Sequence, residues 1–136
     1  MTTRALKYPL SESAARTLQA ASGRRLADIT AESARAGELT MADFQISADT
    51  LRAQAEVARQ AGYPQQASNL IRAAELTAVP NIEVLRMYNI LRPGRATHAE
   101  LSALADLLAT HYHAPECARL VREAAAIYET RNLVQK

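Results

Sequence analysis

Three histidines and a single cysteine are the first residues that could do chemistry, because imidazole and thiolate groups are the usual ligands of zinc. They are His98, His111, His113 and Cys117. A zinc site needs three or four ligands that converge. His111 and His113 are two residues apart near an expected helix end, where a charged imidazole is stabilised by the helix dipole. Cys117 falls in an expected first helical turn without a clear base partner. The pattern therefore predicts neither a metal site nor a nucleophile.

Carboxylates are also spaced in a way that argues against acid–base catalysis, which needs two of them in reach of one substrate. The acidic residues are dispersed, and several fall in expected first turns of helices, where the helix dipole favours them. The sequence contains no Gly-rich phosphate loop, no dinucleotide-binding fingerprint and no G-x-S-x-G motif. It therefore predicts no catalytic, cofactor-binding or metal-binding residue in this chain.

The composition indicates one helical domain with a thin core. The chain has 136 residues, of which 49% are hydrophobic, but alanine dominates this group and there is one Phe and no Trp. Because alanine buries little area, helices built from it often need an outside surface to complete their packing. The first indication is therefore that this chain works with a partner.

Charge and hydropathy exclude several classes of function. The net charge of +2, from 16 basic and 14 acidic side chains, is too small to indicate binding to nucleic acid or to an anionic membrane. No apolar run approaches the ~20 residues that span a bilayer, and the first ten residues lack the apolar segment of a secretory signal. A single cysteine fits a reducing compartment. We therefore expect a cytoplasmic protein without a membrane partner.

Two regions are expected along the chain. Residues 1–46 should form an irregular N-terminal arm with short helices, one capped by Thr30 and ending at Gly37, and one with Thr40 and Asp43 in capping-box spacing. Residues 47–136 should form a helical domain. No segment alternates like a β-strand, so the expected class is all-α, an open up-and-down helical bundle with an irregular N-terminal segment.

Capping residues, prolines and glycines predict five helices in the second region. They should cover about residues 48–61, 64–78 and 80–91 and then begin after Thr97 and at Pro115. The third helix is expected to turn Ile82, Leu85 and Tyr88 inward. The last helix is expected to bury one face, formed by Leu120, Val121, Ala124, Ile127 and Tyr128.

Several blocks of the sequence resemble the small subunit of adenosylcobalamin-dependent diol and glycerol dehydratases. In order, they are "YPL" at Tyr8–Leu10, "LADIT" at Leu26–Thr30, "ISADTLRAQAEVARQAG" at Ile46–Gly62, "RAAELTAVPNIEVLRMYNILRPGR" at Arg72–Arg95, "AELSALADLL" at Ala99–Leu108 and "VREAAAIYETRNLV" at Val121–Val134. The resemblance covers about residues 8–134. Its most specific parts are "RAAELTAVP" and "YNILRP".

The resemblance implies a non-catalytic function in a radical hydro-lyase. In this family the holoenzyme is a dimer of heterotrimers with large, medium and small subunits. The large subunit holds the substrate and a metal ion, and adenosylcobalamin lies between the large and medium subunits. The enzyme converts propane-1,2-diol or glycerol to the corresponding aldehyde and water. The small subunit is helical, rests mainly against the large subunit and supplies no catalytic group, which agrees with the chemistry expected from the residues.

Two features depart from the family pattern. Some members carry a longer N-terminal extension that limits solubility or directs them to a bacterial microcompartment, whereas this sequence begins seven residues before "YPL". That resembles the shorter, glycerol-dehydratase-like form and argues against microcompartment targeting through this subunit. Gly94 also stands where the family often has a bulky residue.

The segment between Arg72 and Arg92 is expected to match a partner's surface as well as the chain's own core. Arg and Tyr are enriched at interface hot spots. The expected subunit-interface residues are Arg72, Glu75, Tyr88, Asn89 and Arg92. The alternative is that Arg72 and Glu75 form an ion pair within the chain, three residues apart on one helix, while Tyr88 belongs to the core. The N-terminal arm is expected to wrap over a partner, because a polar extended segment has little reason to order alone.

Two functions remain open from the sequence. The first is the non-catalytic small subunit of a radical dehydratase, assembled with the large and medium subunits. The second is a free-standing helical adaptor or regulator that has the same fold. The two differ in whether cobalamin-dependent aldehyde formation requires this chain.

Overall fold

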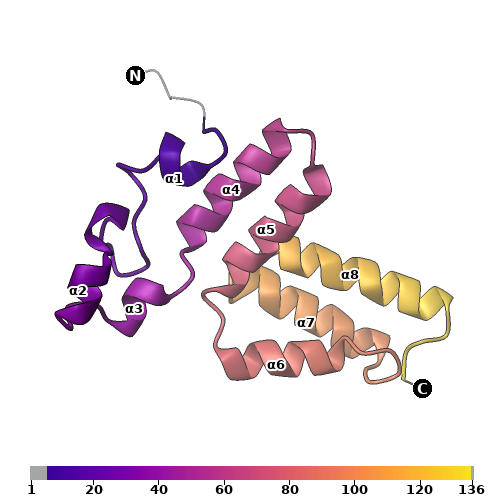
Figure 1. The fold of residues 1–136 in the computed structure, drawn as a ribbon. Helices are drawn as coiled ribbons and strands as arrows, with labels where there is room; N and C mark the ends of the chain where they lie inside the picture. The colour runs from indigo at the N-terminus through magenta and orange to yellow at the C-terminus, as the bar shows by residue number, and fades with distance from the viewer. Residues whose placement is uncertain (1–5, 136) are drawn as a thin grey trace. The chain divides into compact units, whose positions relative to one another are not determined.

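Helices form the regular structure of this protein, as seen in a computed structural model that describes residues 6–135 (Figure 1). They are α1 (Leu10–Ser13), the 3-10 helix η1 (Leu26–Asp28), α2 (Ala31–Arg35), α3 (Met41–Phe44), α4 (Ala48–Gln60), α5 (Pro64–Leu76), α6 (Asn81–Ile90), α7 (His98–Thr110) and α8 (Pro115–Thr130). Within residues 6–135, β structure is limited to one isolated bridge between Gln19 and Arg25. The predicted all-α class is confirmed.

The chain divides into two compact units, one ending at Ala74 and one beginning at Glu75. The division falls close to the end of α5. This division is a different one from the boundary expected after residue 46, which separates an irregular N-terminal arm from a helical domain. That boundary stays a prediction. None of the helices in residues 6–135 combines the length and the apolar character that crossing a membrane requires.

Local capping sets the helix starts, as the sequence predicted. Thr30 forms a capping box with Ser33 at the start of α2, and the Ser47 hydroxyl accepts a hydrogen bond from the backbone N–H of Thr50 at 3.3 Å. At α7, Thr97 and Glu100 exchange hydrogen bonds in a full capping box. The backbone N–H of Thr97 is the main reason why the pKa of Glu100 lies below its ordinary value.

The second unit has a hydrophobic core built from leucine, valine and alanine. Its buried residues come from the turn before α6, from helices α6, α7 and α8, and from the short loops between these helices. Leu101 and Ala105 of α7 and Ala118 of α8 are fully buried. Because alanine side chains are small, α7 and α8 can approach each other closely, and they pack side by side. A short loop joins the two helices.

The buried face of α8 differs from the predicted one. Val121 is buried and Tyr128 packs against the core, as expected, but Leu120 is 42% exposed and Ile127 is 49% exposed. The face that packs contains Cys117, Ala118, Val121 and Ala125. Ala118, Val121, Ala125 and Tyr128 are three or four residues apart and share one face of the helix, whereas Leu120 and Ile127 lie beside that face.

Leu101→Ala should lower the free energy of unfolding of the purified chain by about 3 kcal/mol, because it opens a cavity at a fully buried position of the core. Leu120→Ala, which removes the same atoms from a partly exposed site, should cost about 1 kcal/mol or less. Urea unfolding followed by circular dichroism compares the two variants. Equal losses would contradict the assignment of the core to α7 and α8.

Candidate functional site

The residues considered as metal ligands do not form one metal-binding group among the described residues. His98 Nε2 is 3.7 Å from Glu129 Oε2, His111 is the C-cap residue of α7, and Cys117 is buried in the first turn of α8. His113 has a positive φ of 51° in the loop that joins α7 to α8. In the part of the chain that the structure describes, no three His, Cys, Asp or Glu side chains gather into a set that could hold a metal ion.

Glu75, expected at the interface, caps a helix of its own chain. Its side chain is buried, and its two carboxylate oxygens accept hydrogen bonds from the backbone N–H groups of Glu116 and Cys117, at 3.0 and 2.8 Å. Ala114, the N-cap residue of α8, has no side-chain acceptor, and Pro115 has no N–H to donate. The carboxylate therefore satisfies the next two N–H groups and places a negative charge at the positive end of the helix dipole.

Arg72 lies on α5 and is half-buried. One of its guanidinium nitrogens donates a hydrogen bond to Asn69 Oδ1, at 3.3 Å. Its place at a subunit interface stays a prediction.

Tyr88, Asn89 and Arg92 are exposed, and the first two lie on α6. On a helix, steps of three and four residues return to the same face, so Tyr88 and Asn89 follow Leu85 on one side of α6. Arg92 lies in the exposed turn after the helix. Of the five expected interface residues, these three are exposed.

Ile82, Leu85 and Tyr88 correct the prediction for this helix. They were expected to face inward, but they are 72%, 66% and 64% exposed. The core instead receives Met87, which is buried, together with Val84 and Ile90. Helix α6 has apolar residues on two faces, so the sequence period alone could not decide which face packs.

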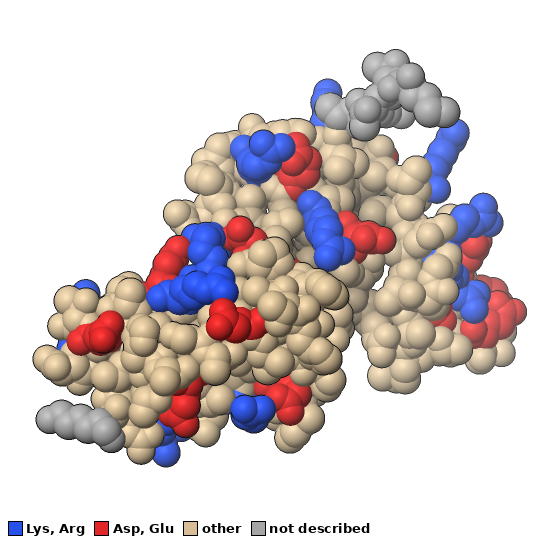
Figure 2. Space-filling model, turned by 180° about the vertical axis from the view of Figure 1, so that it is seen from behind, with Lys and Arg blue, Asp and Glu red and all other residues tan. Residues whose placement is uncertain are grey.

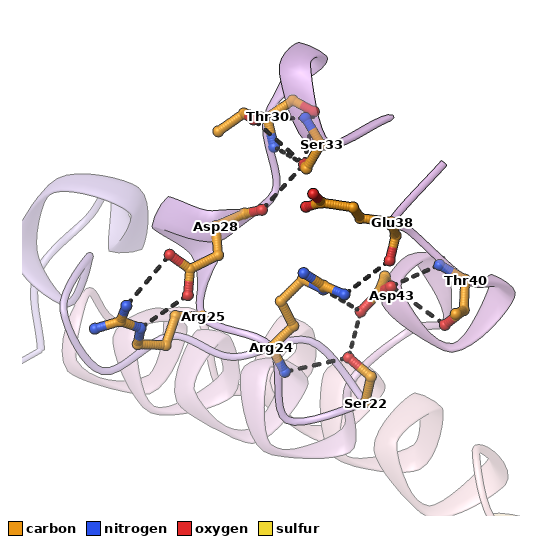
Figure 3. A network of polar contacts seen from close by, with 9 residues as sticks. All are labelled: Ser22, Arg24, Arg25, Asp28, Thr30, Ser33, Glu38, Thr40 and Asp43. Atoms are coloured by element: carbon orange, nitrogen blue, oxygen red, sulfur yellow. Dashed lines mark hydrogen bonds and ion pairs between the residues drawn. The ribbon is translucent and has the colours of Figure 1, made fainter. Parts of the chain in front are cut away.

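A polar network orders the irregular segment of the first unit (Figure 3). The carboxylate of Asp43 accepts hydrogen bonds from the Ser22 hydroxyl at 2.5 Å, from the backbone N–H of Thr40 at 2.7 Å and from Arg24 Nε at 3.2 Å. Arg24 also donates to the carbonyl oxygen of Glu38 at 2.8 Å. The sequence predicted the local capping box at Thr40, but not Ser22 or Arg24, which come from about twenty residues earlier in the chain.

These contacts lower the pKa of Asp43 from 3.8 to about 2. The hydrogen bond from Ser22 is the largest cause, followed by the one from the Thr40 backbone, and the charge of Arg24 adds to them. The negative charge of Asp43 is compensated within the network by these hydrogen bonds and by Arg24. The network therefore stabilises the fold of residues 22–43.

Charged side chains of both signs are interleaved on the face seen in Figure 2. Among the described residues, several charged side chains form pairs three residues apart on one helix, such as Arg59 with Glu56 and Arg86 with Glu83. The face in Figure 2 therefore carries no extended patch of one sign of the kind that attracts nucleic acid.

Comparison with known proteins identifies the family. Residues 3–135 match the dehydratase small subunit family. The chain is 45% identical over 130 residues to the propanediol dehydratase small subunit of Citrobacter freundii, which covers 96% of this chain and 76% of that protein. It is 44% identical over 124 residues to the propanediol dehydratase small subunit of Salmonella typhimurium, which covers 91% of this chain and 72% of that protein.

The chain therefore belongs to the dehydratase small subunit family. This confirms the family that the sequence blocks resembled. It also confirms the predicted function at the level of a subunit of a dehydratase, which is a hydro-lyase.

Glu75→Gln should lower the free energy of unfolding by about 2 kcal/mol, because the amide loses the charge and turns a donor toward an N–H group of α8. Glu123→Gln, on the exposed part of α8, should change it by about 0.5 kcal/mol or less. Thermal unfolding of the purified chain measures both. If Glu75 acted in subunit contact alone, Glu75→Gln would unfold like the wild type.

The Asp43 network predicts an acid-sensitive arm. Because the pKa of Asp43 is lowered on folding, its contribution to stability is complete above pH 3.8 and is lost as the pH falls toward about 2. Asp43→Asn should lower the melting temperature at pH 6 and narrow the gap between the melting temperatures at pH 6 and pH 2.5. A variant with the pH dependence of the wild type would contradict this account.

Proposed function

We propose that this chain is the non-catalytic small subunit of an adenosylcobalamin-dependent dehydratase that converts propane-1,2-diol, or glycerol, to an aldehyde and water. The observation that carries the proposal is the identity of about 45% with a propanediol dehydratase small subunit over nearly the whole chain. In this proposal, the chain assembles with a large and a medium subunit as a dimer of heterotrimers in the cytoplasm, either free or within a bacterial microcompartment.

The residues of this chain do not suit the cofactor. Among residues 6–135, no buried side-chain nitrogen or oxygen lacks a hydrogen-bond partner. No buried polar group of these residues therefore needs a corrin or a nucleoside to complete its hydrogen bonds. An open hollow of about 680 Å³ in the first unit is lined mostly by apolar side chains, among them Leu10, Val57 and Leu70. The proposal therefore assigns cobalamin to the large and medium subunits and derives no chemical step from this chain.

Exposed apolar side chains in the first unit support an assembled state. The large ones are Tyr8, Leu26, Met41, Phe44, Ile46 and Tyr63. The buried apolar residues of that unit are mostly alanines, so its folding hides little apolar area. Exposed large side chains in this density are typical of a surface that another protein covers. Wrapping of residues 1–46 over a larger subunit is part of the proposal.

The proposed function predicts that omission of this chain slows aldehyde formation strongly. The large and medium subunits, purified together without it, should form aldehyde from propane-1,2-diol at least about tenfold more slowly than the complete set, and addition of the chain should restore the rate. The measurement is adenosylcobalamin-dependent aldehyde formation, with bovine serum albumin as the control addition. A free-standing adaptor would leave the rate unchanged, and that result would reject the proposal.

A further inference from the structure

The outer face of α6 carries a line of large apolar side chains. Ile82, Leu85 and Tyr88 are spaced three residues apart and are 72%, 66% and 64% exposed. We call these three residues the α6 ridge. Asn89 lies on the same side of the helix, and Arg92 follows in the exposed turn after its C-terminal end. Single exposed apolar residues are common, but a continuous line on one helix marks a surface that a partner covers.

The opposite face of α6 packs into the core of the second unit and fixes the position of the α6 ridge. Met87 is 5% exposed in the core, and Val84, Ile90 and Leu91 pack against the same cluster. At the end of the helix, the Tyr128 hydroxyl donates a hydrogen bond to the carbonyl oxygen of Leu91, at 2.7 Å. The ridge is therefore presented in a fixed position, which lowers the entropy that docking would cost.

The charges beside the α6 ridge indicate what the partner offers. Arg86 is paired with Glu83 at 3.1 Å, and seven other arginines among residues 6–135 are likewise paired with a carboxylate. Arg92 and Arg95, which follow the ridge, are exposed and form no ion pair with any of the residues that the structure describes. A complementary surface would be apolar opposite the ridge and acidic opposite these two arginines.

A second copy of this chain fits the α6 ridge poorly. The three side chains expose roughly 400 Å² together, so two ridges facing each other would bury roughly 800 Å², below the ~1,000 Å² of a stable interface. A second copy would also place its own Arg92 and Arg95 near those of the first, with no free carboxylate on α6 to pair with them. The one carboxylate of α6, that of Glu83, is already paired with Arg86. A larger partner can cover the ridge and further surface of this chain at once.

We propose that the α6 ridge is an anchor of the contact with a larger dehydratase subunit, with Arg92 facing an acidic group of that subunit. The inference rests on the proposed function, because it takes the partner from there. It adds Ile82 and Leu85 to the interface, although sequence periodicity had assigned both to the core.

The test measures the affinity of the full-length chain for the purified complex of large and medium subunits. Leu85→Ala should raise the apparent Kd by about tenfold, and Leu85→Ala with Tyr88→Ala should raise it by about 100-fold. Arg92→Glu should raise it by about tenfold at low salt and by less at high salt, because an exposed charge pair is screened. Aldehyde formation at limiting concentrations of this chain should fall in the same order.

Matched controls lie on α8 of the same unit. Ile127→Ala truncates a side chain that is 49% exposed and has the same number of atoms as that of Leu85, and it should leave the Kd unchanged. Arg131→Glu reverses another exposed arginine at the end of α8 and controls for net charge. Because all of these side chains are exposed, each variant should melt within about 2 °C of the wild type.

The outcomes separate the inference from the function on which it rests. Weaker binding of the ridge variants, with normal binding of the α8 controls, supports the inference. Normal binding of the ridge variants overturns it and leaves the proposed function standing. A lower melting temperature confined to the ridge variants overturns it, because the ridge would then belong to the chain's own fold. If the isolated chain self-associates and Leu85→Ala abolishes that self-association, the inference is also overturned, because the ridge would then bind a second copy of this chain. Failure of the wild type to bind rejects the proposed function itself.

Discussion

The second unit depends on one buried carboxylate. Glu75, at the end of α5, accepts hydrogen bonds from the start of α8, so the chain from residue 75 to residue 117 forms a closed loop that contains α6 and α7. A buried charge is tolerated where its lone pairs are satisfied by charge-assisted hydrogen bonds, and the N-terminus of a helix supplies both the donors and a favourable potential. The specific sequence around "RAAELTAVP" thus has a purpose inside the chain itself.

The sequence predicted what is local and missed what is distant. The capping residues Thr30, Ser47 and Thr97 start their helices as expected, because a cap and its partner are three residues apart. The function of Glu75 was not predicted, because its partners are 41 and 42 residues away. One signal was present: Ala114 precedes the Pro115 that opens α8, and alanine cannot cap, so that helix needed an acceptor from elsewhere in the chain.

The error at α6 has a physical cause. When a helix has one apolar face, the sequence shows which side packs, but α6 has one apolar face that includes Met87 and another that includes Leu85. Both faces satisfy the helical period, and only the packing against α7 and α8 selects between them. The candidate interface was therefore predictable only in part. Asn89 and Arg92 were assigned to the surface from residue type, Ile82 and Leu85 were assigned to the core, and Tyr88 was expected in both places.

The single thiol offers a built-in reporter of motion. Cys117 is 6% exposed within the core cluster, and its backbone N–H is held by Glu75. A thiol reagent reaches it only when α8 lifts away from its neighbours, so the labelling rate records how often this part of the molecule opens. Because the sequence contains no other cysteine, that rate can be compared between the isolated chain and the assembled enzyme without any introduced probe.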